Sequence, residues 1–155
     1  AALMEAVAQA GFEQLAQMIR EARESHPGDP VSQLRDAGIA YVMWATDNPE
    51  RTRLMFGGMM KSDDIDETLH ETAEAAYAEI YQIIDEGRQS CVFAGPSAEA
   101  VVLSCWASVH GLTMLILGTR KLSPQTKEEI RSLAALVCDT ILAGIAARKR
   151  ESQLP

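Results

Sequence analysis

A tryptophan, a histidine and a glycine stand close together in a long uncharged stretch of the chain. Trp106 and His110 are four residues apart, so on a helix their side chains share one face. Gly111 beside them allows a neighbouring helix to approach closely. A single histidine on an apolar helix is more often packed in a core than used for binding, and the residues alone leave both roles open for His110.

The pattern Glu67-x-x-His70, with Glu71 and Glu74 nearby, has a spacing that di-metal helical bundles use. Such a site needs a second Glu-x-x-His and further inward carboxylates, which the sequence does not offer. The apolar positions around Leu69 turn these glutamates outward instead. We therefore expect a solvated helix face, with no metal and no cofactor.

Nucleophilic catalysis finds little support. The sequence has no Gly-x-Ser-x-Gly elbow and no glycine-rich phosphate loop, and Cys105 and His110 are five residues apart on one helix, where they point in different directions. The cysteines, Cys91, Cys105 and Cys138, are odd in number and widely spaced, which is typical of free thiols in a reducing cytoplasm. We expect a cytoplasmic protein that is not an enzyme.

Apolar residues recur at steps of three and four along most of the chain, which predicts helices rather than strands. The expected fold is all-α, with one domain over residues 1–150 and a disordered tail over residues 151–155. Its six helices are expected near residues 3–24, 31–46, 49–59, 63–87, 97–118 and 124–145.

Several short motifs indicate where these helices begin and end. Asp29-Pro30 and Asn48-Pro49 each combine an N-cap residue with a proline at the first helical position. Asp64 to Glu67 reads as a capping box. Gly87 is expected just after the end of the fourth helix, and Ser123-Pro124 at the start of the last one.

The chain is acidic, with a formal charge of −8, so it repels phosphate backbones and should bind nucleic acid poorly. The stretch from Ala100 to Thr119 has no charged residue and is long enough to span a membrane. It also carries Ser104, Ser108 and His110 and lacks an aromatic belt, so we expect a buried helix and no membrane partner.

The last two long helices are more apolar than a single core requires, which predicts a homodimer built on a four-helix bundle. The expected interface residues are Val109, Leu112, Ile116, Ile130, Leu133, Val137 and Ile141. Methionines and aromatic residues on the central helices suggest a cavity for a small apolar ligand, although core packing also explains them. The expected ligand-binding residues are Trp44, Met55, Phe56, Met59, Tyr77, Tyr81, Trp106 and His110.

Three segments, in order and spacing, resemble the C-terminal domain of TetR-family transcriptional regulators. Trp106-x-x-x-His110-Gly111 resembles the Trp-His-Gly signature of one type of this domain. Tyr41-Val42, then Asn48-Pro49, then Arg53-Leu54-Met55-Phe56 resemble a second conserved segment. The stretch AALMEAVAQAGF at residues 1–12 is similar to the one that follows the helix-turn-helix in such proteins.

The resemblance implies a regulatory domain in which residues 1–25 form the helix that links it to a DNA-reading domain. The helices from about residue 31 to 118 would surround an effector cavity, and the last two would form the dimer bundle. A repressor released by a small apolar or aromatic ligand is the implied function, with DNA bound only through a helix-turn-helix ahead of Ala1. A stand-alone helical bundle that binds a ligand or acts as an enzyme stays open as the alternative.

Overall fold

The computed structural model describes residues 2–57, 67–118, 122 and 126–147, and these residues form an all-α fold, as predicted. Outside the helices, the described residues pair only at a single bridge between Phe93 and Ala146. The helices are α1 (Ala2–Ser25), α2 (Pro30–Asp47), α3 (Pro49–Phe56), α4 (Glu67–Gln89), α5 (Ala98–Gly118) and α6 (Lys127–Ile145).

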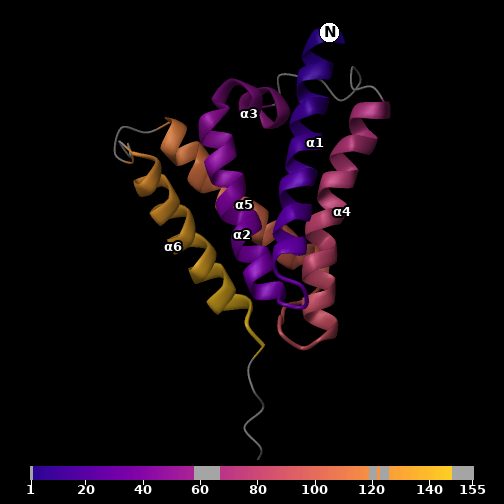
Figure 1. The fold of residues 1–155 in the computed structure, drawn as a ribbon, viewed down its shortest axis with the longest axis vertical. Helices are drawn as coiled ribbons and strands as arrows, with labels where there is room; N and C mark the ends of the chain where they lie inside the picture. The colour runs from indigo at the N-terminus through magenta and orange to yellow at the C-terminus, as the bar shows by residue number, and fades with distance from the viewer. Residues whose placement is uncertain (1, 58–66, 119–121, 123–125, 148–155) are drawn as a thin grey trace, which may run out of the picture.

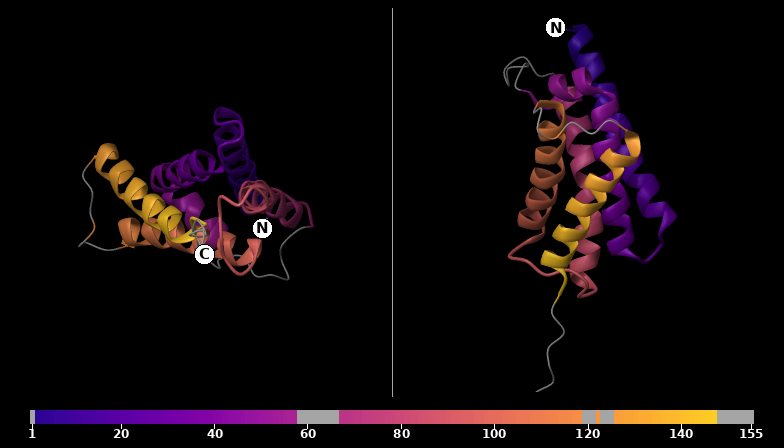
Figure 2. Two further views of the ribbon diagram at one scale, coloured as in Figure 1. Left: turned by 90° about the horizontal axis from the view of Figure 1, so that it is seen from below. Right: turned by 90° about the vertical axis from the view of Figure 1, so that its left-hand side faces the viewer.

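Helix α2 lies at the centre of the bundle and contacts each of the other five helices. Helices α1 and α4 pack together on one side of it, and α5 and α6 lie toward the other side (Figures 1 and 2). The short helix α3 closes the end of the bundle at which α1 begins (Figure 1). This arrangement leaves the first turns of α1 projecting, with Leu3 79% exposed.

A predicted helix start is confirmed where the side chain of the cap residue forms a hydrogen bond with the backbone. The Asp29 carboxylate accepts a hydrogen bond of 3.1 Å from the Ser32 backbone N–H, and Pro30 opens α2. Pro49 opens α3, but the Asn48 side chain forms no cap there, and its amide donates to the Trp44 carbonyl at the end of α2. The expected capping box at Asp64 lies outside the described residues.

Helix α6 begins at Lys127, three residues later than the Ser123-Pro124 motif predicted. Its N-terminus is a capping box in which the Thr126 hydroxyl accepts from the Glu129 backbone N–H, while the Glu129 carboxylate accepts from the Thr126 backbone N–H. These reciprocal bonds satisfy two of the N–H groups that a helix start leaves unpaired, so they fix the start there.

The prediction that Gly87 follows the end of α4 is wrong, since the helix continues to Gln89. A Cβ atom on Gly87 would lie 2.3 Å from the Phe93 ring, so the glycine is required by close packing. The chain turns instead at Cys91, whose φ is 58°, and the N–H groups of Val92 and Phe93 donate back to the Gly87 carbonyl. Phe93 thereby folds back against the helix that it has just left.

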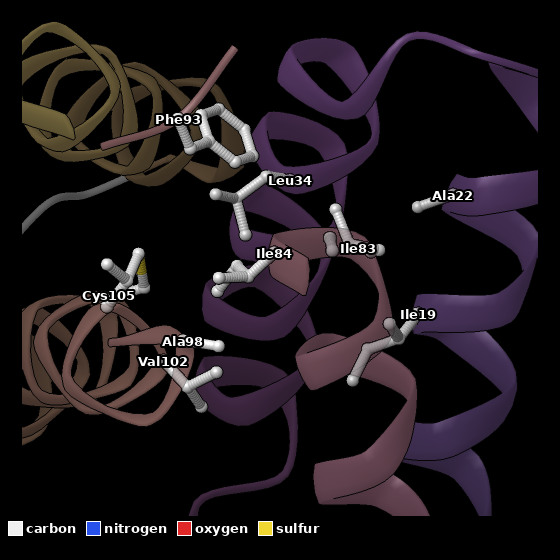
Figure 3. Close-up of a cluster of buried hydrophobic side chains, with 11 residues drawn as sticks. Ile19, Ala22, Leu34, Ile83, Ile84, Phe93, Ala98, Val102 and Cys105 are labelled. Atoms are coloured by element: carbon white, nitrogen blue, oxygen red, sulfur yellow. The ribbon is translucent and has the colours of Figure 1, made fainter. Parts of the chain in front are cut away.

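Two adjoining clusters form the apolar core. The first joins α1, α2, α4 and α5, and its side chains converge on Ile83 and Ile84, which are fully buried (Figure 3). The second joins α2, α5 and α6 around Val42 and Ala134. Both clusters include residues of α2 and α5, so these two helices are the frame on which the others are placed.

Helix α5 is long and apolar enough to cross a membrane by length and composition, and only 33% of its most apolar window is buried within the chain. We expected this helix to be buried on most sides by its own domain and by a partner together. A single chain covers only one side of it.

Candidate ligand cavity

An apolar cavity of about 360 Å³ lies at the centre of the bundle. Its size is within the range of about 300–1,000 Å³ that is usual for small-molecule sites. All six helices contribute to its wall, so it is a product of the whole fold. The lining residues are Phe12, Leu15, Ile19, Leu34, Ala37, Gly38, Tyr41, Phe56, Ala73, Glu74, Ala76, Tyr77, Ile80, Val102, Cys105, Trp106, Val109, Cys138, Ile141 and Leu142.

Phe56, the last residue of α3, is the centre of an aromatic cluster on this wall. Its ring lies 5.5 Å from that of Phe12 on α1 and 6.4 Å from that of Tyr41 on α2, measured between centroids. On α5 it lies 5.6 Å from the Trp106 ring and 5.1 Å from the His110 ring. Tilted and edge-on rings at such distances attract one another. One side chain thus connects the cavity with three helices besides its own.

His110 lies beside the cavity wall and is hydrogen-bonded to Tyr41. The Tyr41 Oη to His110 Nδ1 distance is 2.6 Å. Burial lowers the pKa of His110 and raises that of Tyr41, so both groups are neutral at pH 7. The bond joins α2 to α5 just behind Trp106, and it positions the aromatic wall.

Two thiols, Cys105 on α5 and Cys138 on α6, line the cavity and are buried. Burial raises the pKa of each to about 11, so both stay protonated at neutral pH. Protonated thiols are poor nucleophiles. These cysteines therefore act as small apolar wall residues, and the free thiol Cys91 is exposed elsewhere.

The structure brings together some of the residues predicted to bind a ligand. Phe56, Tyr77 and Trp106 are on the cavity wall, and His110 is directly behind it. Met59 lies outside the described residues.

The other predicted binding residues lie away from the cavity, because each of them packs on a different face of its helix. The Trp44 indole N–H donates to the Gln14 side chain, 3.0 Å away, on the outer side of α1 and α2. Met55 packs against Gly11. The Tyr81 hydroxyl points to Glu99, at 3.4 Å.

The predicted interface residues also divide into two groups. Val109 and Ile141 line the cavity, and Leu112 is 7% exposed inside the second core cluster, so these three side chains face the interior of their own chain. They are apolar because of the core and cavity they line. The remaining four are partly buried and pack against the second cluster: Ile116, Ile130, Leu133 and Val137.

Sequence reasoning missed the wall residues of α1 and most of those of α2. Phe12, Leu15 and Ile19 recur at steps of three and four, but that stripe was attributed to a linker helix rather than to a ligand site. Leu34 and Tyr41 stood in an apolar pattern that core packing explains equally well. Periodicity identifies an inward face, but it cannot distinguish a filled interior from a hollow one.

On α4, the side chains of Glu67, His70 and Glu71 are exposed, as expected for a solvated face. Glu74 is exposed as well, but it also lines the cavity. Among the described residues, no group of three or more histidines, cysteines or carboxylates could hold a metal ion.

The fold has relatives among solved structures. A protein of unknown function from Rhodococcus sp. RHA1 is 22% identical, with a TM-score of 0.82, and the match covers 94% of this chain and 74% of that one. A bacterial regulatory protein in the TetR family from Rhodococcus RHA1 is 17% identical, with a TM-score of 0.72, covering 96% and 75% of the two chains. None of the curated proteins compared with the chain matches it.

The match to a protein family is more specific evidence of relationship than the similarity of fold. Residues 34–147 match the family described as tetracyclin repressor-like, C-terminal domain. The matched range includes most of the cavity wall and the Trp106-x-x-x-His110-Gly111 motif, and it covers well over half of the chain. The chain therefore belongs to the family of tetracyclin repressor-like C-terminal domains.

Proposed function

We propose that residues 1–150 are the effector-binding and dimerisation domain of a transcriptional regulator, and that the effector is a small apolar or aromatic molecule. The observation that carries the proposal is the cavity of about 360 Å³, which is lined by apolar side chains from all six helices. The cavity opens to solvent, so its apolar wall stays in contact with water unless a ligand covers it. Covering apolar surface is favourable.

The effector would act on the regulator through α1. Phe12, Leu15 and Ile19 of α1 form part of the cavity wall, so a ligand contacts this helix directly. In a dimer, a change in the position of α1 alters the spacing of whatever each subunit carries ahead of it. DNA would be bound only by a helix-turn-helix domain joined there, and the ligand would favour the state that releases it. The domain itself would be neither an enzyme nor a membrane protein, and it would act in the cytoplasm.

Dimerisation would use the outer faces of α5 and α6. Leu103 on α5 is 61% exposed and Leu136 on α6 is 63% exposed. A side chain placed at Gly111 or Gly144 would meet nothing within 4 Å, so the chain's own packing does not require a glycine at either position. Small residues between exposed leucines suit a second copy of the same two helices, whose backbones would approach closely.

A pair of alanine substitutions on α4 tests the cavity as the binding site. Ala73 lines the cavity, whereas Ala75 is exposed and does not. Ala73→Phe should fill the mouth of the cavity without a loss of melting temperature, and Ala75→Phe is the matched control. A neutral probe, para-phenylbenzyl alcohol, should raise the melting temperature of the parent and of Ala75→Phe but not that of Ala73→Phe. Equal stabilisation of all three proteins would place the ligand outside this cavity.

A further inference from the structure

The wall of the cavity carries a charge of one sign. Glu74 is the only ionisable carboxyl among the described lining residues, and no lysine, arginine or histidine is among them. His110, which lies behind the wall, is kept neutral at pH 7 by the burial that lowers its pKa. Among the described residues, a ligand inside the cavity therefore meets an anionic group and no cationic one.

Glu74 stands at the opening of the cavity. Three wall residues are exposed to solvent, Glu74 and Tyr77 on α4 and Trp106 on α5. The cavity therefore opens beside these three side chains. Farther in, the wall consists of aliphatic residues, Gly38, phenylalanines, Tyr41 and the two protonated thiols.

The Glu74 carboxylate is not engaged elsewhere in the described part of the chain. Glu79 and Glu86, farther along α4, pair with arginines of α1 at distances of 2.8–3.7 Å. No described side chain forms a hydrogen bond or an ion pair with Glu74, in contrast to these two. It is free to pair with the charged group of a ligand.

Building on the proposed ligand cavity, we infer that the ligand class is a hydrophobic organic cation, an amine or a quaternary ammonium ion with an aromatic or aliphatic body. Its apolar body fills the cavity. Its cationic head lies at the mouth, beside the Glu74 carboxylate and the ring faces of Tyr77 and Trp106. Carboxylates pair with cations, and indole and phenol faces attract them through the ring quadrupole. An anionic ligand of the same shape would meet Glu74 with like charge.

Three probes of one shape and different charge test this inference: para-phenylbenzylamine, para-phenylbenzyl alcohol and para-phenylbenzoate. Titration calorimetry at pH 7 and low salt should show the amine binding at least about fivefold more tightly than the alcohol, the expected effect of a partly exposed ion pair together with a cation–π contact. The benzoate should bind more weakly than the alcohol.

Variants on α4 test whether the Glu74 carboxylate causes the preference for the amine. Glu74→Gln should reduce the amine to the affinity of the alcohol, and Glu74→Lys should make the benzoate the preferred probe. Glu71→Gln, which removes an exposed charge one turn away from the wall, should leave the amine preference intact. An amine preference that survives Glu74→Gln would overturn the inference. Equal binding of all three probes would overturn it too, while leaving the proposed cavity standing. If none of the three probes bound, the inferred ligand class and the proposed ligand cavity would both be contradicted.

Discussion

At the scale of single residues, the clearest feature is the hydrogen bond between Tyr41 and His110. It is 2.6 Å long, and Tyr41 is 5% exposed. Its removal leaves a partly buried histidine nitrogen without this partner. Such a loss costs about 1–3 kcal/mol of the free energy of unfolding.

Tyr41→Phe should therefore lower the free energy of unfolding by about 1 kcal/mol or more, measured by urea denaturation. Tyr81→Phe is the matched control, because the Tyr81 hydroxyl is 3.4 Å from Glu99 at the surface, and its loss should cost much less. If the two variants were equally stable, the bond between α2 and α5 would contribute nothing of note.

The lowered pKa of His110 also predicts how stability depends on pH. Because burial disfavours the protonated imidazole, the folded chain binds this proton less readily than the unfolded chain does. The contribution of His110 to stability is therefore complete above its ordinary pKa of 6.5 and is lost as the pH falls below that value. His110→Gln, which does not titrate, should lose less stability than the parent between pH 7.5 and 5.5. An identical loss in both proteins would contradict this assignment.

The chemistry of the binding residues was only partly predictable from the sequence. Trp106 was identified through its spacing from His110, and Tyr77 as an aromatic residue with a polar tip on a central helix. Trp44 has the same character, yet it packs against the second core cluster, away from the cavity, and donates to Gln14. Residue type limits what a side chain can do. Its orientation depends on which helices pack on either side, and that is a property of the tertiary fold.

At the scale of elements, α3 connects the cavity to α1. Phe56 touches the ligand space, Phe12 on α1 and the Trp106–His110 pair on α5. A ligand that fixes the Phe56 ring thereby restrains Phe12, and with it the first half of α1.

Hydrogen exchange measured by mass spectrometry can follow this connection. Binding of para-phenylbenzyl alcohol should slow the exchange of amides in the first half of α1, because local opening there would have to break the Phe12–Phe56 contact. In Phe56→Leu the ligand should still bind, but the added protection of that half of α1 should be reduced. If protection in this variant equalled that in the parent, α3 would not be the connection.

The helices themselves were largely predictable, whereas their ends depended on local competition. Asp29-Pro30 defined the start of α2 as predicted, since the carboxylate reaches the Ser32 N–H. At Asn48 a similar motif gives no side-chain cap for α3, and the Asn48 amide donates instead to the Trp44 carbonyl at the end of α2. The prediction for Gly87 was wrong because the sequence does not distinguish a glycine required for packing, here against Phe93, from a glycine that ends a helix.

At the scale of the whole molecule, α5 leaves the large apolar side chains Leu103, Trp106 and Leu115 exposed, and α6 adds the exposed Leu136. The sequence predicted an interface on these helices, but Val109, Leu112 and Ile141 face the interior of their own chain. An amphipathic pattern shows that a helix has an apolar stripe. It cannot divide a helix that is apolar all round into an inner and an outer face.

The exposed leucine of α6 is therefore the position at which to test dimerisation. Leu136→Glu should dissociate the dimer, because it would bury an unpaired charge against the second copy, at a cost of several kcal/mol. Light scattering should then report a mass near the 16.9 kDa of a single chain. Leu3→Glu, at an exposed apolar residue in the first turn of α1, should remain dimeric. A monomeric parent protein would contradict the dimer outright.

Trp106 lines the cavity, so its fluorescence can report directly whether an apolar ligand occupies it. The chain has two tryptophans, and Trp44 does not line the cavity, so in Trp44→Phe all indole emission comes from Trp106. Titration of this variant with para-phenylbenzyl alcohol should change the Trp106 emission and saturate at one molecule per chain. If the alcohol raised the melting temperature while the Trp106 emission stayed constant through saturation, ligand binding in this cavity would be contradicted.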